Sequence, residues 1–387
     1  MDLISKKILV TGGAGFIGSY LIKKLLKTSS SIRVLDCLSP QIHGQIPKNL
    51  EWLYNDKLEF IRDSITSKKT VERALEGIDT VIHLAAETGT GQSMYEISRY
   101  FDVNVQGTAN LLDVLQNNKF GTSVRSLIVA SSRAIYGEGS YMCSVHGIVF
   151  PESRTNDHMF SGNFEVYCPK CEQVLTLTST EETAPFRPMS VYGLTKQVQE
   201  QAVLMYARTN NLNAFALRYQ NVFGPGQSLK NPYTGILAVF SNLARQGQPI
   251  DVYEDGLESR DFVYIDDVVE ASMRAVMYDG SFAGALNVGT GEAVPVITVA
   301  QEINSYFGNK SEIRISGAFR LGDIRHNKAA THRLESVLNF KPSVSFREGL
   351  HKFLAWVETQ PLEDKSAYQK SVAELQERGL MGHGQGA

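Results

Sequence analysis

The stretch Val10–Gly18 reads VTGGAGFIG. It places Gly12, Gly15 and Gly18 at three-residue intervals, directly after a short apolar run and directly before a helix-like stretch. Glycines at this spacing permit a tight turn and the close approach of a pyrophosphate, which the N-terminus of the helix binds through backbone N–H groups. We therefore predict a dinucleotide-binding loop between the first strand and the first helix of a Rossmann-type sheet.

Strand and helix patterns alternate on both sides of this loop. Runs rich in leucine and β-branched residues are typical of strands buried on both faces, and they occur at 7–10, 32–36, 58–61, 80–85 and 126–130. Apolar residues recur at helical spacing between them, over 16–27 and 99–118. Repeated β-α units predict an α/β fold with a doubly wound parallel sheet.

The pattern becomes less regular after about residue 225. We predict a Rossmann domain over 1–225, a smaller α/β substrate domain over 226–362, and a polar C-terminal tail over 363–387. The chain is expected to return to the first domain at 260–290, with "RDFVYID" and "ALNVG" as further strands of the sheet. The final "GHGQGA" (382–387) is expected to be disordered.

Composition limits the classes of function. The 387 residues are 43% hydrophobic and 20% charged, with a net charge of −3, which is typical of a globular protein and gives no basic surface for nucleic acid. No apolar run reaches the length of a bilayer span, and the N-terminal "MDLISKKILVTGG" leads straight into the glycine motif rather than resembling a signal peptide. We expect a cytoplasmic protein that binds no membrane and keeps its thiols reduced.

A carboxylate stands where the cofactor's ribose is expected. Asp36 lies at the end of the second predicted strand, 18 residues after Gly18. A carboxylate at this point accepts hydrogen bonds from ribose hydroxyls and repels a 2′-phosphate, so NAD is favoured over NADP.

The segment "YGLTK" pairs a tyrosine with a lysine. Tyr192 and Lys196 are four residues apart, so one face of a helix presents both. A nearby ammonium is expected to lower the pKa of the phenol toward working pH, as an acid/base catalyst requires. "SSRAIYG" (131–137) follows the strand at 126–130 and places hydroxyl groups at the C-terminal edge of the sheet, where ligands bind in such folds.

Seven motifs, in the same order along the chain, resemble those of a known enzyme family. The glycine loop, "HLAA", "NVQGT", "SSRAIYG", "YGLTK", "LRYQNVFGPG" and "RDFVYIDDV" together resemble the extended short-chain dehydrogenase/reductases, and more narrowly the NAD-dependent nucleotide-sugar epimerases and dehydratases. The resemblance covers about residues 6 to 360. It implies cofactor contacts from Gly12, Gly15, Phe16, Ile17, Gly18, Asp36, Asp63, Ile65, Leu84, Ala85, Ala86, Asn104 and Lys196. It implies substrate contacts from Thr88, Ser132, Arg133, Tyr192, Asn221, Arg260, Arg320 and Asp323, with the arginines on the diphosphate.

The same resemblance implies the catalytic roles. Ser132 matches the hydroxyl that hydrogen-bonds the reacting sugar oxygen, Tyr192 the acid/base, and Lys196 its partner. The dehydratases have an Asp-Glu pair directly after that serine, whereas this chain has Arg133 and Ala134. Arginine stays protonated and alanine has no titratable group, so neither can act as the general acid, and dehydration is disfavoured. Epimerisation at C4 through a keto intermediate is therefore expected.

Three of the four cysteines lie in an insertion at about 139–183, between Ser132 and Tyr192. Cys143-x-x-His146 and Cys168-x-x-Cys171 form two half-sites of the kind that hold a structural zinc ion. His158 is an alternative to His146 as fourth ligand, and an idle or redox-active thiol pair is the alternative to a metal site. Cys37 is expected to be an ordinary free thiol.

The insertion, with "NPYTGI" and "EDGLESRDF", is similar to that of the dTDP-L-rhamnose 4-epimerases. The resemblance implies a dTDP-linked 6-deoxyhexose substrate, with dTDP-6-deoxy-L-talose as product, and a homodimer formed by the helices at 99–118 and 192–209. A UDP-hexose or UDP-uronate 4-epimerase is the alternative enzyme. A catalytically silent NAD-sensing scaffold is the alternative from another class.

Overall fold

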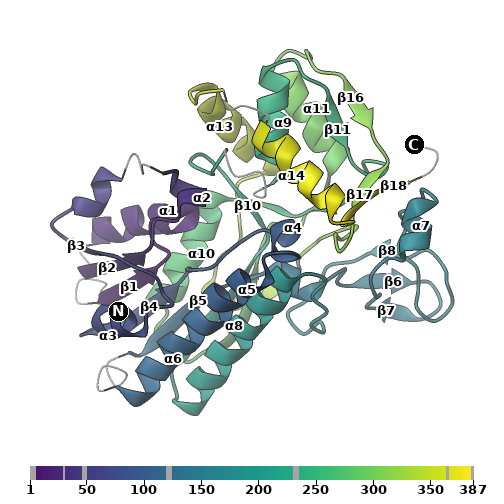
Figure 1. Cartoon of the computed structure of the whole chain (residues 1–387). Coiled ribbons are helices and arrows are strands. Elements are labelled where there is room, and N and C mark those ends of the chain that lie inside the picture. The colour runs from purple at the N-terminus through teal and green to yellow at the C-terminus, as the bar shows by residue number, and fades with distance from the viewer. Residues whose placement is uncertain are drawn as a thin grey trace.

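A seven-stranded sheet lies at the centre of the molecule (Figure 1). The structure, a computed structural model, describes residues 6–28, 31–45, 50–118, 124–229, 235–362 and 366–384. The sheet order is β14-β9-β5-β4-β1-β2-β3, and neighbouring strands run parallel. The strands span Lys7–Thr11 (β1), Ser31–Asp36 (β2), Leu58–Arg62 (β3), Thr80–His83 (β4), Ser126–Ser132 (β5), Asn213–Tyr219 (β9) and Ala283–Val288 (β14). The predicted Rossmann-type fold is confirmed, with the strand order reversing between β1 and β4.

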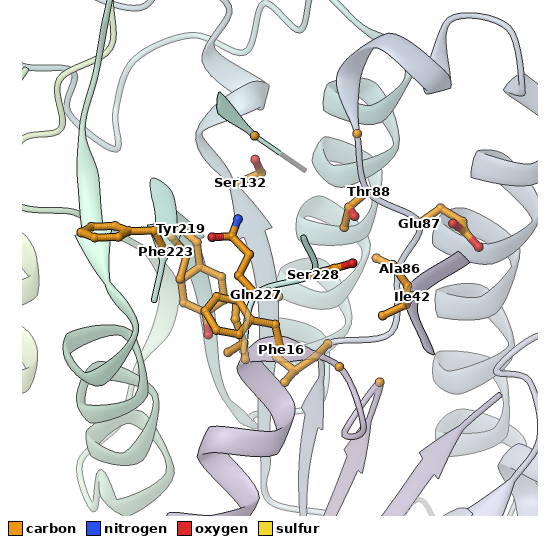
Figure 2. A pocket seen from close by; sticks show the side chains of 18 of the residues that line it. Phe16, Ile42, Ala86, Glu87, Thr88, Ser132, Tyr219, Phe223, Gln227 and Ser228 are labelled. Carbon is orange, nitrogen blue, oxygen red and sulfur yellow. The ribbon is translucent and has the colours of Figure 1, made fainter. Parts of the chain in front are cut away.

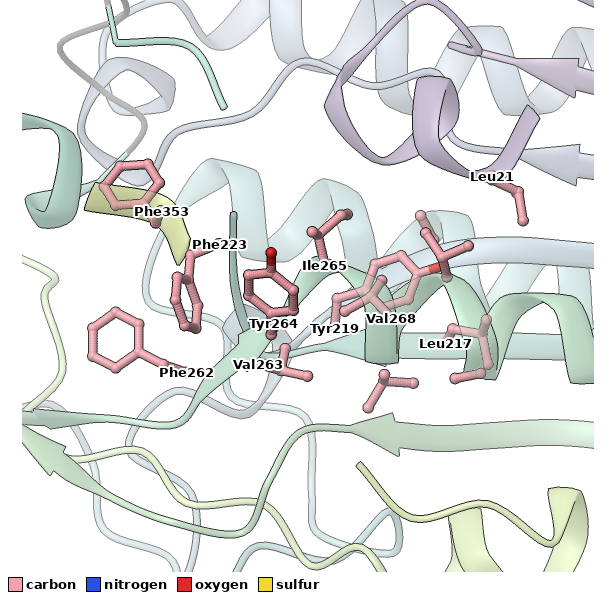
Figure 3. Packing of buried hydrophobic residues seen from close by; sticks show 14 of the residues in the cluster. Leu21, Leu217, Tyr219, Phe223, Phe262, Val263, Tyr264, Ile265, Val268 and Phe353 are labelled. Atoms are coloured by element: carbon pink, nitrogen blue, oxygen red, sulfur yellow. The ribbon is translucent and has the colours of Figure 1, made fainter. Parts of the chain in front are cut away.

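Helices cover both faces of the sheet, as the apolar strands require. One face packs against α1 (Phe16–Leu25) and α10 (Ile265–Met277), and the other against α3 (Lys68–Leu75), α6 (Gly107–Asn117) and α8 (Val191–Thr209). Figure 3 shows Leu217 and Tyr219 of β9 beside Ile265 and Val268 of α10. Burial on both faces explains why these strands read as continuous apolar runs.

Two predicted helices differ in detail from their observed form. The helix expected over 16–27 is α-helical to Leu25 and continues as a 3₁₀ turn over Leu26–Thr28. The helix expected over 99–118 begins earlier, as α5 (Ile97–Tyr100), and passes through a π-helical turn (Phe101–Gln106) into α6. Shorter elements are α2 (Pro40–His43), α4 (Thr90–Ser93) and 3₁₀ turns over Glu51–Tyr54 and Arg133–Tyr136. None of the helices in the described ranges has both the length and the apolar character that crossing a bilayer requires.

The second part of the chain forms small sheets rather than extending the large one. β10 (Asn221–Phe223) pairs with β13 (Phe262–Tyr264), β11 (Ile250–Val252) with β16 (Ile313–Ile315), and β12 (Ser259–Arg260) with β15 (Val294–Pro295). The accompanying helices are α9 (Ile236–Arg245), α11 (Val296–Tyr306), α12 (His332–Leu338) and α13 (Phe346–Glu358). The expectation that "RDFVYID" joins the central sheet is therefore wrong, since β13 pairs with β10. The chain returns to the sheet through α10 and then β14, which contains "ALNVG" except its last glycine.

The insertion has a small core of its own. β6 (Tyr141–Cys143) lies between β7 (Gly147–Val149) and β8 (Thr176–Leu177) in an antiparallel sheet, and α7 (Asn156–Phe160) follows β7. The buried members of this core are Tyr141, Cys143, Val149, Val166, Cys168 and Leu175. Two of the six are cysteines, so apolar burial alone gives this segment little stability.

The described part of the C-terminal tail, 366–384, is folded, in contrast to the expectation for 382–384. It forms α14 (Ser366–Glu377) and β18 (Met381–His383), and β18 pairs antiparallel with β17 (Ala318–Arg320). Leu375 of α14 is buried against Gly91, so the tail connects β17 to the α4 segment (Figure 1). The prediction of disorder is wrong for 382–384 because backbone pairing stabilises a polar strand without an apolar pattern, and 385–387 lie outside the described residues.

Candidate active site

A cavity of about 930 Å³ opens at the C-terminal edge of the central sheet. Figure 2 shows Ser132, Thr88, Gln227 and Phe16 around the same opening. The predicted site residues that line it are Gly12, Gly15, Phe16, Ile17, Gly18, Asp36, Asp63, Ile65, Leu84, Ala85, Ala86, Thr88, Ser132, Arg133, Tyr192, Lys196, Asn221, Arg260, Arg320 and Asp323. Segments far apart in sequence thus meet at one cavity.

The glycine loop has the geometry that a pyrophosphate needs. Gly12 has φ +69°, and a Cβ atom there would lie 2.6 Å from the backbone nitrogen of Ala85. A Cβ atom on Gly18 would lie 2.6 Å from the Cα atom of Gly13, so the helix can pack onto the loop only with glycine here. Gly15 is the N-cap of α1, and no side chain caps this helix end. The loop therefore fits a dinucleotide phosphate on the helix N-terminus.

Two aspartates mark the ends of the next strands. The carboxylate of Asp36 accepts hydrogen bonds from the backbone nitrogens of Ala14 (3.0 Å) and Leu38 (2.8 Å), so it lies against the glycine loop. Asp63 follows β3, and the Thr70 hydroxyl donates to its carboxylate and lowers its pKa. Both side chains line the cavity on the side where the adenosine half of a dinucleotide is expected.

Ser132, Tyr192 and Lys196 line the cavity on the β5 side of the glycine loop, near the middle of the sheet edge. Ser132 ends β5, and its hydroxyl is close enough to the phenol of Tyr192 to act on the pKa of that group. Gly193 allows this approach, because a Cβ atom there would lie 2.5 Å from the carbonyl oxygen of Ala134. Ser190 caps α8 by accepting a hydrogen bond from the backbone nitrogen of Gly193. The helix start therefore places the tyrosine beside the serine.

The electrostatics of this group differ from the expectation. Burial raises the pKa of Tyr192, and the Ser132 hydrogen bond and the charge of Arg133 oppose the rise. Burial also lowers the pKa of Lys196 to about 7, and its Nζ atom donates to Oε1 of Gln199 at 2.7 Å. The expected lowering of the pKa of Tyr192 by Lys196 is not seen in this structure: the net shift is upward because of desolvation, Lys196 is not among its causes, and the lysine donates to Gln199 instead.

Cationic side chains gather at the substrate end of the cavity. Arg260 donates from Nη2 to Oδ1 of Asp323 at 3.2 Å, and the guanidinium of Arg320 stacks on the ring of Tyr253 at 5.2 Å. Burial and the charge of Arg260 lower the pKa of Arg133 to about 10. These three arginines line the cavity together with Asp323 and Glu258, so this end suits an anionic ligand such as a diphosphate.

Comparison with known proteins identifies the family. The NAD dependent epimerase/dehydratase family matches residues 8–289. The dTDP-L-rhamnose 4-epimerase of Burkholderia thailandensis is 38% identical over 365 residues, which cover 93% of this chain and 97% of that protein. A putative UDP-glucose 4-epimerase of Methanocaldococcus jannaschii is 28% identical over 352 residues, which cover 90% of this chain and 98% of that protein. The chain belongs to the NAD-dependent epimerase/dehydratase family.

Solved structures agree with this assignment. The UDP-glucose 4-epimerase of Thermotoga maritima, solved with UDP-glucose, has a TM-score of 0.72 at 28% identity. The match covers 91% of this chain and 98% of the Thermotoga chain. MoeE5, solved with UDP-glucose and NAD, has a TM-score of 0.69 at 28% identity with the same coverage. The predicted family is thus confirmed, and with it the dependence on NAD.

One predicted cofactor residue of this family member does not line the cavity. Asn104 is fully buried, and its amide bonds the backbone of Glu87 (2.7 and 3.1 Å) and the Thr195 hydroxyl (3.0 Å). The structure therefore places Asn104 behind the wall of the site, where it ties the loop after β4 to α8.

A buried network behind Lys196 was not predicted. Gln199 accepts from Lys196 and donates to Thr108 at 2.8 Å, and it lies 3.2 Å from Nε2 of His83. Burial lowers the pKa of His83 to about 3, so the ring is neutral. The sequence signal was the position of Gln199, three residues after Lys196 on the same face of one helix.

The insertion of this family member brings four possible metal ligands together. The ligand atoms of Cys143, His146, Cys168 and Cys171 all lie within 4.8 Å of one another. Nδ1 of His146 is 3.5 Å from Sγ of Cys143 and 3.6 Å from Sγ of Cys168, and the sulfurs of Cys143 and Cys171 are 3.7 Å apart. His158 packs on Tyr167 instead and is not in this cluster.

Proposed function

We propose that this protein is an NAD-dependent nucleotide-sugar 4-epimerase. The observation that carries the proposal is that Ser132, Tyr192 and Lys196 line one cavity together with three arginines, Arg133, Arg260 and Arg320. Arg133 and Ala134 follow the serine, so the carboxylic acids that expel water in the dehydratases are missing from their positions. Redox chemistry at one sugar carbon is the reaction that the remaining groups support.

The proposed roles follow from the positions of the side chains. Tyr192 takes the proton of the sugar 4-hydroxyl and later returns it to the 4-keto oxygen, while Ser132 donates a hydrogen bond to that oxygen. The bound NAD would supply the redox step, accepting a hydride from C4 and returning it to the opposite face. Asp36 would bind the adenosine ribose, and Arg260 and Arg320 the diphosphate of the substrate.

The proposed substrate is dTDP-L-rhamnose, with dTDP-6-deoxy-L-talose as the product. The 38% identity to the Burkholderia enzyme, along nearly the full length of both chains, supports this substrate over UDP-hexoses and UDP-uronates, since a putative UDP-glucose 4-epimerase and a probable UDP-glucuronate 4-epimerase are 28% and 25% identical. The cysteine-bearing insertion supports the same subfamily. The intact Ser132, Tyr192 and Lys196 argue against a silent NAD-sensing scaffold.

Turnover of dTDP-L-rhamnose in heavy water tests the mechanism. The hydrogen on C4 moves as a hydride and stays away from water, so every carbon-bound hydrogen of the product should remain protium. NMR of each sugar carbon reads the result, with the reaction in ordinary water as control. Deuterium at C5 would exclude the proposed mechanism, because it requires proton exchange at carbon. Turnover of a UDP-hexose alone would keep the mechanism and reject the substrate.

We also propose a structural zinc ion in the insertion. A tetrahedral zinc with Zn–S about 2.3 Å and Zn–N about 2.05 Å needs sulfurs about 3.75 Å apart and sulfur–nitrogen distances of about 3.55 Å. The separations of 3.7, 3.5 and 3.6 Å fit these values. Backbone N–H groups, first that of Val145, lower the pKa of the Cys143 thiol and favour the thiolate that zinc binds. The geometry supports His146 rather than His158 as fourth ligand.

A homodimer formed by the α5–α6 and α8 segments is proposed as the assembly. Ile97, Phe101, Leu194 and Met205 are large apolar side chains exposed on these helices, and a second copy could cover them. Phe101→Glu together with Met205→Glu should halve the mass measured by analytical ultracentrifugation. Leu257→Glu, at an equally exposed apolar residue elsewhere, is the control and should leave the mass unchanged. A wild-type chain that sediments as a monomer would rule the dimer out.

A further inference from the structure

Arg154 is a buried arginine of the insertion, between β7 and α7, and only 2% of its side chain is exposed. Its two Nη atoms donate to the two carboxylate oxygens of Glu254, both at 2.8 Å, in a forked pair. Nη2 also donates to the carbonyl oxygen of Asp323 at 3.1 Å, and Nε lies 3.4 Å from Oε1 of Glu138. Arginine is rarely buried unless it is paired, so this position is built around the guanidinium.

One partner of Arg154, Asp323, lines the substrate end of the cavity. Asp323 is held twice, because its carbonyl oxygen accepts from Arg154 and its carboxylate accepts from Arg260 at 3.2 Å. Glu254 is shared with Arg325, whose Nη1 atom donates to it at 3.0 Å. Arg260 and Asp323 line the cavity, whereas Arg154 does not. The link between Arg154 and the cavity therefore runs through Asp323.

The insertion also contacts the segment that contains Asp323 through aromatic side chains. Phe160 and Phe164 of the insertion pack edge-on against Phe319 of β17, with ring centroids 5.1 and 6.2 Å apart. Arg320 directly follows Phe319, and Asp323 lies three residues further on. The insertion thus holds the β17 segment at two points, by aromatic packing before Arg320 and by the Arg154 guanidinium after it.

We propose that Arg154 is a positioning residue that sets the geometry of Asp323 and Arg260 for a nucleoside diphosphate. This inference rests on the proposed function, since it takes the arginines as the diphosphate site. A buried guanidinium–carboxylate pair with two parallel hydrogen bonds has one favoured geometry, so the Arg154–Glu254 pair can hold the backbone of Asp323 in one position. Lysine would keep the charge and lose the fork, because an ammonium is a single compact donor group.

Two variants test the proposal in the full-length, NAD-loaded protein. Arg154→Lys removes the fork, and Arg154→Met combined with Glu254→Gln removes both charges without leaving Glu254 as an unpaired carboxylate. Calorimetry with dTDP alone and with UDP alone measures the site without relying on turnover. We expect dTDP to bind about tenfold more weakly, which is within the range of effects that residues outside a ligand site have on binding. KM should rise by the same factor, and kcat should change less. NAD content should be unchanged, because the glycine loop is remote from Arg154.

Glu152→Gln is the matched control, since Glu152 belongs to the same insertion and pairs with Arg187 at the surface. It should leave dTDP binding at the wild-type value. Wild-type dTDP affinity in both Arg154 variants would overturn the proposal and leave the proposed function intact. The proposal would also be overturned if both variants lost NAD and melted at a lower temperature while their folded fraction bound dTDP with wild-type affinity. Arg154 would then have a purely structural role. Failure of the wild-type protein to bind either nucleotide would instead refute the proposed function itself.

Discussion

Turnover is expected to fall about 10²–10⁴-fold when Tyr192 is replaced by phenylalanine. The substitution keeps the ring, which packs edge-on against Tyr100 at a centroid distance of 6.5 Å, and removes only the hydroxyl that exchanges a proton with the sugar. NAD content should stay at the wild-type level, because the glycine loop and Asp36 are untouched. Steady-state kinetics with dTDP-L-rhamnose and the absorbance of cofactor released by denaturation measure the two effects.

Tyr206→Phe is the matched control, because it makes the same change on the same helix, outside the cavity. It should leave turnover within about twofold of wild type, as expected for a residue that touches no reacting group. Near-normal turnover of Tyr192→Phe would show that the proton passes by another route, with the neighbouring Ser132 as the first candidate.

The second large effect is expected in the insertion. Serine at both Cys168 and Cys171 removes two of four proposed ligands, and the bound zinc should fall from about one per chain to nearly none. Structural zinc contributes about 10–16 kcal/mol to the folding of zinc-finger peptides, so a segment with this small a core should lose its order. Elemental analysis measures the metal, and limited proteolysis within 139–183 measures the order.

Two controls separate the ligands from their neighbours. Cys37→Ser changes an exposed thiol outside the cluster and should keep the zinc. His158→Ala should keep it too, whereas His146→Ala should lose it, since only His146 lies beside the cysteines. A wild-type protein free of zinc after purification without chelators would contradict the metal site. Loss of zinc from His158→Ala but not from His146→Ala would reverse the ligand assignment.

Much of the Rossmann part could be predicted because its signals are local. The glycine spacing, the apolar strands and the four-residue interval of Tyr192 and Lys196 each depend on a few neighbouring residues, and short-range geometry places them reliably. The insertion could be predicted from its cysteines for the same reason, since a C-x-x-C half-site is a local turn. The proposal of His146 rather than His158 rests on the fold, because it depends on which histidine lies beside Cys168.

Electrostatic properties could not be predicted from spacing. Tyr192 and Lys196 are adjacent on α8, yet burial sets the direction of both pKa shifts and Gln199 takes the lysine's hydrogen bond. Desolvation depends on everything packed around a group, much of it distant in sequence. Arg154 is a similar case, because its partner Glu254 lies 100 residues away and no motif links them.

From the sequence alone came the alternation of strands and helices up to β5, the glycine loop, the Tyr192–Lys196 interval and the two cysteine-containing pairs of the insertion, because each depends on residues a few positions apart. The tertiary structure alone decided that β13 pairs with β10 outside the central sheet, and that the polar tail forms β18 beside β17. Strand pairing is made by backbone groups that every residue carries, so a short strand's partner is chosen by the packing of the whole chain.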